Sequence, residues 1–497
     1  MRTMIKRQPL RFLVFCGLAV LYALPVQAAG LEGDDTFIRR VMADWQVPGL
    51  AVIAIKDGRV VLQKGYGVRA VGGTQPVTPK TLFALGSITK TVTVAGLMVL
   101  AEQGKLDWDA PLSRLLPGFR LNDPETTRTV TPRHLVSHQT GLPRHDVLWY
   151  VEAFSRAEMV RRLRYLKATA QSATVFQYNN LMVMTAGVLA GHIAGTSWED
   201  FTRRTLLEPL GMRAAHLSLD AFRQTPDRAE PYILTQAGRV ALGLRNTDAI
   251  APASGLYANA DDLSLFLNLL LAKGGKVLSA PRVAAMLQPQ IKAPGGDGGA
   301  ELGPRQYGMG LFVTTYRGHR LAYHPGFIDG YGARLSMLPD RDIGVLVLTN
   351  LSGLNRAPTV VSRYLLDRLL GLEPVPWNDR LLAAYRQNPV SNNAPLKTGA
   401  PAHPLSAYEG AYGHPGYGTI QIVGKGNGLA GRIHKIDFEL LPMGGDRWRV
   451  AETAWPLRQG LVMTFEVDKG RLLTPLADGP SYPYKVGAVA FQRVDQL

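Results

Sequence analysis

The sequence predicts an α/β domain followed by a separate, smaller all-β domain. Strand patterns at both ends of residues 30–370 enclose a long, mainly helical stretch, which implies one sheet closed by segments far apart in the chain. After residue 405, short runs of alternating apolar and polar residues are separated by glycine turns, a pattern typical of a small barrel or sandwich. The length of 497 residues also exceeds the roughly 150 residues of one average domain.

The first segment has the composition of an export signal. Basic residues precede an apolar run over residues 12–24, and Val26-Gln27-Ala28 forms a small-residue cleavage site. The alternative is a membrane anchor, but about 13 apolar residues fall short of the roughly 20 that a helical span requires. We therefore expect residues 1–28 to be a signal peptide, with a secreted, periplasmic protein and no membrane span after its removal.

Charge and cysteine content limit the partners and the chemistry. The net charge is +16, with the basic residues scattered along the chain, which favours acidic envelope polymers or anionic membrane surfaces over nucleic acid. Peptidoglycan fragments are candidate partners. The only cysteine, Cys16, lies in the predicted signal peptide. The mature protein is thus expected to have no disulfide, no thiol nucleophile and no cysteine metal ligand.

The first half of the α/β domain begins with two paired strands. Residues 50–55 and 60–63 read as strands, and Asp57-Gly58 between them marks a hairpin turn. Residues 88–103 have helical spacing, end at Gly104 and are apolar on most sides, so this helix should be buried. Residues 105–270 are mainly helical patterns separated by proline and glycine loops.

The second half of the domain returns to strands. Residues 320–324, 333–338 and 343–348 read as strands, and a helix is expected over residues 357–370. Residues 371–405 are rich in proline and read as a linker that carries one short helix near residues 377–387. The all-β domain then covers residues 406–497.

Ser87 and Lys90 are the first candidates for chemistry. Three residues apart on a helix, their side chains share one face, and the helix N-terminus offers N–H groups that would stabilise an oxyanion. A lysine in a buried stripe is costly unless its pKa falls, and a neutral amine can take the proton of a serine. The alternative is a plain helix cap at Ser87, with Lys90 extending to water.

Two more motifs follow in order. Tyr178-Asn179-Asn180 begins another helical pattern, and His324-Pro325-Gly326 ends a strand. Together with Ser87 and Lys90 they resemble the three motifs of the serine β-lactamase and penicillin-binding-protein superfamily, in its class C-like branch. Segments 47–50, 135–143 and 253–263 also resemble landmarks of that family. The tail from residue 408 is similar to the lipocalin-like domain appended to some of these hydrolases, including D-aminopeptidase-type members.

The resemblance implies a role for each matching residue. Ser87 would be the acylated nucleophile and Lys90 the base that activates it, with the base work shared jointly with Tyr178. Tyr178 would also relay the proton to the leaving group and help to activate water. Asn180 would hold the substrate carbonyl. The N–H groups of Ser87 and Phe327 would form the oxyanion hole.

The third motif departs from the Lys-Thr-Gly of typical β-lactamases. His324 and Gly326 take the substrate-binding positions of this motif, and the histidine would be mostly neutral at pH 7. Pro325 removes a hydroxyl that binds a substrate carboxylate. Both changes weaken recognition of the carboxylate of a β-lactam or of a C-terminal D-residue.

Two further patterns are less favoured alternatives. Tyr257-Ala258-Asn259 also fits Tyr-x-Asn, but its flanking residues match a different family segment, so we prefer Tyr178. His134 and His138 share a helical face, but without an acidic partner at metal-ligand spacing we expect capping or packing roles instead of a zinc site. We expect no metal and no cofactor.

These observations predict an exported serine hydrolase that forms an acyl-enzyme at Ser87. Its substrates would be small peptides or amides that contain D-residues, or small esters. A β-lactamase or a D-Ala-D-Ala carboxypeptidase is the alternative within the same family. The alternative of another class is a non-catalytic peptidoglycan-binding protein.

Overall fold

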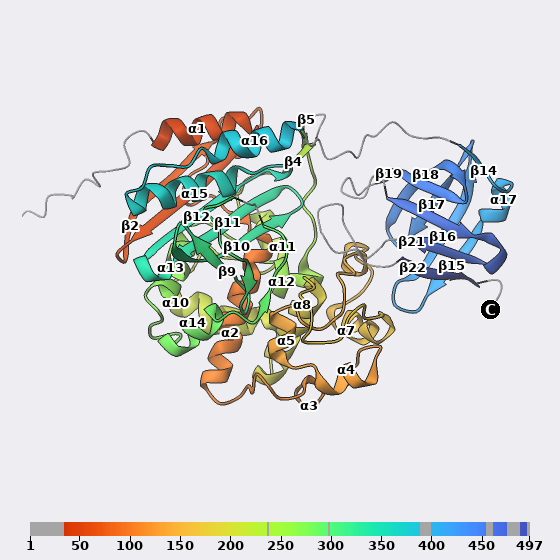
Figure 1. Ribbon diagram of the computed structural model, residues 1–497, viewed down its shortest axis with the longest axis horizontal. Coiled ribbons are helices and arrows are strands. Elements are labelled where there is room, and N and C mark those ends of the chain that lie inside the picture. Colours follow the sequence, from red (N-terminus) through yellow and green to blue (C-terminus); the bar gives the residue numbers. More distant parts are fainter. Residues whose placement is uncertain are drawn as a thin grey trace, which may run out of the picture.

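The structure is a computed structural model that describes residues 34–235, 238–296, 299–387, 399–453, 461–474 and 488–494. It contains an α/β region and a β-barrel, which confirms the predicted fold class (Figure 1). The predicted signal peptide lies outside the described residues.

The described helices are mostly short, and six of them, α1, α2, α8, α13, α15 and α16, have eleven or more residues. Their bounds are α1 (Asp34–Asp44), α2 (Thr89–Glu102), α3 (Leu112–Leu115), α4 (Pro124–Thr129), α5 (Pro132–Val136), α6 (Val147–Tyr150), α7 (Arg156–Arg162), α8 (Asn180–Ala194), α9 (Trp198–Thr202), α10 (Glu208–Leu210), α11 (Leu219–Gln224), α12 (Ala251–Ser254), α13 (Ala260–Leu271), α14 (Ala280–Leu287), α15 (Ala357–Leu370), α16 (Trp377–Gln387) and α17 (Leu405–Tyr408). Helices α15 and α16 match the predicted helical segments.

The strands form one large sheet, two small sheets and the barrel. Their bounds are β1 (Gly49–Lys56), β2 (Arg59–Gly67), β3 (Phe83–Ala84), β4 (Tyr232–Thr235), β5 (Gly238–Ala241), β6 (Tyr257–Ala258), β7 (Ile291–Lys292), β8 (Gln306–Tyr307), β9 (Phe312–Tyr316), β10 (His319–Ile328), β11 (Tyr331–Leu338), β12 (Ile343–Thr349), β13 (Ser352–Gly353), β14 (Gly399–Pro401), β15 (Gly410–His414), β16 (Gly418–Lys425), β17 (Gly428–Ile433), β18 (Ile436–Gly445), β19 (Arg447–Thr453), β20 (Val462–Glu466), β21 (Arg471–Thr474) and β22 (Val489–Arg493).

The large sheet joins segments that are distant in the sequence. Its strand order is β2-β1-β12-β11-β10-β9-β8-β7, and β1 pairs with β12 in a register that places Leu50 opposite Thr349. The expected closure of the sheet by distant segments is therefore confirmed. Asp57 and Gly58 both have positive φ, at 51° and 69°, as the two-residue turn between β1 and β2 requires.

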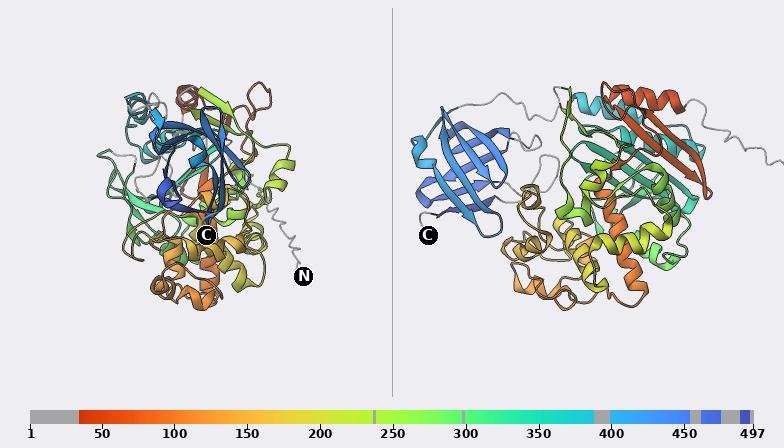
Figure 2. Two further views of the ribbon diagram at one scale, coloured as in Figure 1. Left: turned by 90° about the vertical axis from the view of Figure 1, so that its right-hand side faces the viewer. Right: turned by 180° about the vertical axis from the view of Figure 1, so that it is seen from behind.

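Both faces of the sheet are covered, which explains the continuous apolar run of β1. Leu50 and Val52 belong to one hydrophobic cluster with residues of α1 and α15, whereas Ala51 and Ile53 belong to a second cluster with residues of α2 and α13. Figures 1 and 2 show α1, α15 and α16 gathered on one side of the sheet. The helical region on the other side carries most of the site described below.

Helices α2 and α8 pack against each other below the sheet, and both are apolar on nearly every side. Such helices belong in a protein interior or a membrane. Among the described residues no single helix is long and apolar enough to cross a membrane, although α8 and the bent segment Trp198–Leu210 pass that test as a pair.

The C-terminal strands close into a barrel. Strands β15 to β22 follow one another round the barrel, β15 pairs with β22, and an additional pairing of β18 with β19 completes the ring. Buried aromatic side chains fill the interior, with Trp448 within 5.1 Å of Tyr408 and Phe465 within 5.6 Å of Tyr412, measured between ring centroids. We call strands β15 to β22 the barrel.

Candidate active site

The fold brings the three predicted motifs to one place. Ser87 lies in the single turn Gly86–Ile88 that leads into α2, and Lys90 follows in the first turn of α2. Asn180 is the first residue of α8, which packs against α2. The turn with Ser87 also packs against β10, the strand that carries the third motif.

Lys90 is fully buried and has three hydrogen-bond partners. Its Nζ lies 2.9 Å from Ser87 Oγ, 2.7 Å from Asn180 Oδ1 and 3.0 Å from the carbonyl oxygen of Ala253. Its exposed fraction is 0%. Ser87 is not a cap residue here, because Leu85 caps the turn Gly86–Ile88 and Ile88 caps α2, so the described structure contradicts the alternative of a plain cap with a solvent-directed lysine.

The partners of Lys90 determine where its lone pair points. The oxygens of Asn180 and Ala253 can only accept hydrogen bonds. A neutral amine has two N–H groups and one lone pair, so both hydrogens go to these two oxygens. The lone pair then faces the hydroxyl of Ser87. Lys90 is thus oriented to accept the proton of Ser87.

Burial favours the neutral form of the amine. Loss of hydration holds the pKa of Lys90 well below its usual value of 10.5, and the nearby Arg144 cation lowers this pKa further. The Asp146 carboxylate acts in the opposite direction.

Asp146 orients the amide of Asn180. Asn180 Nδ2 donates to Asp146 Oδ1 at 3.0 Å, so the oxygen of the amide is the end that faces Lys90. Trp149 Nε1 donates to the same carboxylate oxygen at 2.9 Å, and Arg144 pairs with the other oxygen. Asp146 and the Ala253 carbonyl were not predicted as parts of the site, because both lie outside the three catalytic motifs and reach Asn180 and Lys90 only through folding.

Tyr178 lies beside the amine. Lys90 Nζ is 4.8 Å from the centroid of the Tyr178 ring, and Arg144 Cζ is 5.3 Å from the same centroid. His138 packs on the ring with a centroid distance of 4.3 Å. The motif Tyr178-Asn179-Asn180 therefore places both of its chemical side chains next to Lys90.

The backbone of Gly86, the residue before Ser87, closely approaches that of Phe327. Gly86 has φ of 52°, and a Cβ atom at this position would lie 2.7 Å from the Phe327 carbonyl carbon and oxygen and 2.8 Å from its nitrogen. A Cβ at Gly326 would lie 2.1 Å from the carbonyl oxygen of Leu85. Both glycines are therefore required for the close contact that brings the two backbone segments of the expected oxyanion hole together.

The third motif differs in two ways from the expectation. Strand β10 does not end at His324-Pro325-Gly326, because it continues to Ile328 and pairs with β11 from Ala322 to Ile328. The His324 ring is 1% exposed, its Nδ1 lies 2.6 Å from the Pro325 carbonyl oxygen and its Nε2 lies 3.1 Å from Tyr307 Oη.

These contacts assign the tautomer of His324. A carbonyl oxygen only accepts, so Nδ1 carries the proton and Nε2 accepts from Tyr307. Burial lowers the pKa of His324 to about 3, which agrees with the expected neutral ring. With both nitrogens engaged, the side chain supports β10 and does not offer a contact to substrate.

The two alternative patterns have structural roles. Tyr257 stacks on Phe222 at 4.5 Å between ring centroids, and Asn259 caps α13. His134 forms a capping box with Thr131. His138 does not share its helical face, because α5 ends at Val136 and His138 has φ of 61°. Among the described residues there is no group of metal-ligating side chains.

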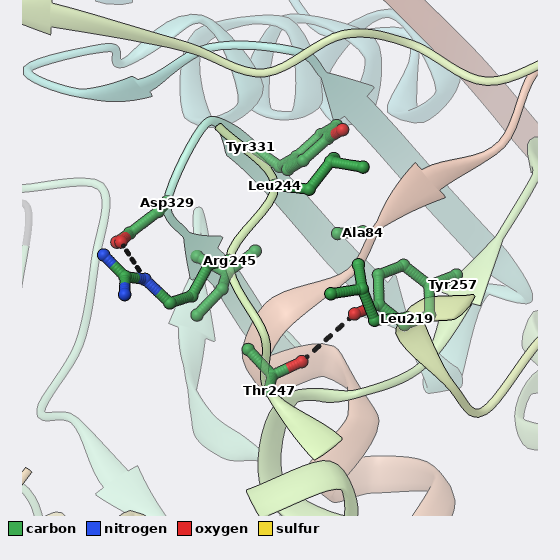
Figure 3. A pocket seen from close by; sticks show the side chains of 9 residues that line it. Ala84, Leu219, Leu244, Arg245, Thr247, Tyr257, Asp329 and Tyr331 are labelled. Carbon is green, nitrogen blue, oxygen red and sulfur yellow. Dashed lines mark hydrogen bonds and ion pairs between the residues drawn. The ribbon is translucent and has the colours of Figure 1, made fainter. Parts of the chain in front are cut away.

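A small pocket lies next to the turn that carries Ser87. Ala84, Tyr257 and Tyr331 contribute to its lining, and Arg245 and Asp329 are also part of it (Figure 3). Arg245 Nε lies 2.9 Å from Asp329 Oδ2, and Tyr150 Oη donates to Asp329 Oδ1 at 2.9 Å. The Asp329 carboxylate is therefore already ion-paired with Arg245 and hydrogen-bonded to Tyr150.

Comparisons with known proteins show which family this chain is similar to. An unguisins hydrolase of Aspergillus campestris is 29% identical over 411 residues, which cover 78% of this chain and 76% of the relative. The solved structure of an octameric penicillin-binding protein homologue from Pyrococcus abyssi has a TM-score of 0.62 at 25% identity, and the match covers 88% of this chain and 97% of that one.

The fold also matches that of a D-amino acid amidase from Ochrobactrum anthropi, with a TM-score of 0.56 at 20% identity over 68% of this chain and 97% of that one. A sequence model of the β-lactamase family matches residues 35–370. This chain belongs to the β-lactamase family and is a serine hydrolase.

Proposed function

We propose that the protein is an exported hydrolase that cleaves amide or ester bonds through an acyl-enzyme at Ser87. Its substrates are small peptides or amides with D-amino acids, or small esters. The observation that carries this proposal is the Lys90 amine, whose two hydrogens are held by Asn180 and Ala253 while its lone pair faces Ser87 Oγ at 2.9 Å.

In the acylation step Ser87 Oγ attacks the substrate carbonyl carbon as its proton moves to Lys90 Nζ. The carbonyl oxygen becomes an oxyanion, which accepts hydrogen bonds from the N–H groups of Ser87 and Phe327. The bond to the leaving amine or alcohol then breaks. The leaving group takes the proton from Lys90 by way of Tyr178, and the acyl group remains on Ser87.

In the deacylation step a water molecule attacks the acyl carbonyl carbon. The Tyr178–Lys90 pair takes one proton from this water, and the same N–H groups stabilise the second oxyanion. The bond to Ser87 Oγ breaks, and the proton returns to this oxygen. The carboxylic acid leaves and the enzyme is regenerated without any cofactor in the proposed steps.

The third motif supports substrates that lack a carboxylate next to the scissile bond. Pro325 has no hydroxyl, and the His324 ring is neutral and buried. A β-lactam or a C-terminal D-residue would therefore find no cation or hydroxyl from this motif. The relative named as an unguisins hydrolase and the neighbour named as a D-amino acid amidase make D-amino-acid amides the first class to test.

Export rests on the N-terminal sequence. The basic residues, the apolar run and the small-residue site of residues 1–28 support a signal peptide and a periplasmic location. N-terminal sequencing of the protein recovered from the periplasm tests this part, with Ala29 expected as the first residue. An uncleaved chain in the membrane fraction would contradict it.

The catalytic proposal is tested with the purified mature protein. We expect a fluorophosphonate to add to Ser87, as located by mass spectrometry of the digest, and we expect turnover of p-nitrophenyl acetate and of D-phenylalanine amide. Ser87→Ala is expected to remove both. Faster hydrolysis of a cephalosporin than of the amide and ester would favour the β-lactamase alternative, and absence of both adduct and turnover would favour a binding protein.

A further inference from the structure

The barrel contacts the region around the active site through one hairpin tip. Residues 415–417 connect β15 and β16, and they meet the segment that includes α7. Tyr417 Oη lies 2.6 Å from His145 Nδ1. Tyr417 is 1% exposed and His145 is 4% exposed, so this polar contact is closed to water.

Other contacts hold the same hairpin tip in place. Arg162 Nη1 donates to the carbonyl oxygens of Pro415 and Gly416 at 2.9 Å and 3.1 Å. A Cβ at Gly416 would lie 2.8 Å from Leu166, so the backbone lies directly on this side chain. Nearby, the rings of Phe154 and His434 meet edge to face at 4.9 Å. Several contacts besides the one between Tyr417 and His145 therefore fix the position of the hairpin tip on the α/β region.

His145 immediately precedes a residue of the active site. Its backbone has φ of 28°, a region that non-glycine residues occupy only when their surroundings hold them there. Asp146 follows and accepts from Asn180 Nδ2, while Asn180 Oδ1 accepts from Lys90. One continuous chain of contacts thus leads from the barrel to the amine that faces Ser87.

We infer that Tyr417 is a positioning residue for hydrolysis, because its hydroxyl fixes His145 and thereby holds Asp146, Asn180 and Lys90 in their relative places. The inference rests on the proposed function, since it concerns the rate of the reaction at Ser87. It makes the barrel, which lies outside residues 35–370, a part of the support of the active site.

The chemistry of the contact suits such a role. Burial, and next to it the neighbouring His414, lowers the pKa of His145 to about 3, against the opposing effects of Asp146 and the Lys167 backbone. The His145 ring is therefore neutral, and its hydrogen bond with the Tyr417 hydroxyl joins two uncharged groups. Removal of the hydroxyl leaves a buried ring nitrogen without this partner, and His145 must shift to satisfy it. Because Asp146 is the adjacent residue, it shifts too.

The test compares two tyrosine-to-phenylalanine variants of the full chain. Tyr417→Phe is expected to lower kcat for p-nitrophenyl acetate and the rate constant of fluorophosphonate labelling roughly tenfold, with KM within about twofold, because misplaced catalytic groups slow the reaction more than they weaken binding. Tyr412→Phe is the matched control, since it removes a buried hydroxyl that donates to the Tyr408 carbonyl oxygen inside the barrel. It is expected to keep the wild-type kcat.

A double-mutant cycle shows whether the hydroxyl acts through His145. His145→Asn keeps a residue that tolerates this backbone and removes the ring, and adding Tyr417→Phe to it should cause no further loss of kcat. Arg162→Met removes the hydrogen bonds from the α/β region to the Pro415 and Gly416 carbonyl oxygens of the same hairpin tip, and it should also lower kcat.

The inference would be overturned if Tyr417→Phe and Arg162→Met both kept the wild-type kcat. It would also be overturned if Tyr417→Phe and His145→Asn had independent effects in the cycle. In either case, fluorophosphonate labelling of the wild type would still uphold the proposed function. Failure of the wild type itself to label or to turn over would instead refute the proposed function.

Discussion

Asn180 Nδ2 donates to Asp146 Oδ1 at 3.0 Å, and this bond decides which end of the amide faces Lys90. The two atoms come from different segments, the start of α8 and the loop before α6. With the amide in this orientation, its oxygen holds one hydrogen of the Lys90 amine. The same amide in the opposite orientation would place two donors against each other.

The first prediction concerns this bond. Asp146→Asn retains the shape of the side chain but loses the charge that pairs with Arg144 and one acceptor site, so the Asn180 amide is less firmly held. We expect kcat for p-nitrophenyl acetate to fall roughly 10- to 100-fold, as for other partners that orient a catalytic ligand.

Asp262→Asn is its matched control. Asp262 is also buried, and its carboxylate accepts from the backbone N–H of Ala214 at 2.8 Å, far along the chain from the motifs. This variant should lose stability and keep its kcat. A kcat for Asp146→Asn within twofold of the wild type would show that Asn180 does not need this support.

The second prediction concerns Gly86. In Gly86→Ala the new Cβ would clash with the Phe327 backbone. The alanine would also have to adopt the left-handed backbone conformation of Gly86. We expect kcat to fall roughly 100-fold, because the two N–H groups of the oxyanion hole are pushed apart, and the free energy of unfolding to fall by about 1–3 kcal/mol.

Gly104→Ala separates these two effects. Gly104 also has positive φ, at 69°, but no atom lies within 4 Å of a Cβ placed there. Its substitution should lower the free energy of unfolding by about 1 kcal/mol without a loss of kcat. Equal losses of kcat in the two variants would argue against a special role for the contact between Gly86 and Phe327.

The third prediction distinguishes the two Tyr-x-Asn sequences. Tyr178→Phe should lower kcat by roughly 10²- to 10⁴-fold, the range of a group that transfers protons in the transition state. Tyr257→Phe removes only a hydroxyl that lies 3.2 Å from Thr247 Oγ1, so kcat should be retained and the free energy of unfolding should fall by about 1 kcal/mol. Steady-state kinetics and urea unfolding of both variants provide the measurement, and the reverse ranking of the two kcat values would refute our choice of Tyr178.

The fourth prediction uses the low pKa of Lys90. In the unfolded chain Lys90 binds a proton below pH 10.5, whereas burial keeps the folded form neutral well below that pH. The unfolded state therefore binds more protons, and the free energy of unfolding rises with pH by up to about 1.4 kcal/mol per pH unit between the two pKa values.

Lys90→Met lacks this linkage. The difference in free energy of unfolding between the wild type and this variant should therefore move in favour of the wild type as the pH rises from 7 to 9, as followed by urea unfolding. A difference that stays constant over this range would mean that Lys90 has the same charge in both states.

The main site residues were predictable because each belongs to a short motif. Ser87 and Lys90 are related by one helical turn, and Tyr178 and Asn180 stand at the start of a helix with a clear apolar pattern. The α/β class and the barrel were also predictable, since apolar periodicity is a local property. The small sheets that contain β3 to β6 were missed, because strands this short leave almost no periodic pattern.

The sequence by itself determined which residues we expect to carry the chemistry and how Ser87 and Lys90 are spaced. Only the tertiary structure decided that Lys90 has a free lone pair toward Ser87, that His324 is turned inward, and that Asp146 belongs to the site. The physical reason is that hydrogen-bond partners and burial arise from contacts between segments far apart in the chain. Helical spacing, by contrast, needs only neighbouring residues.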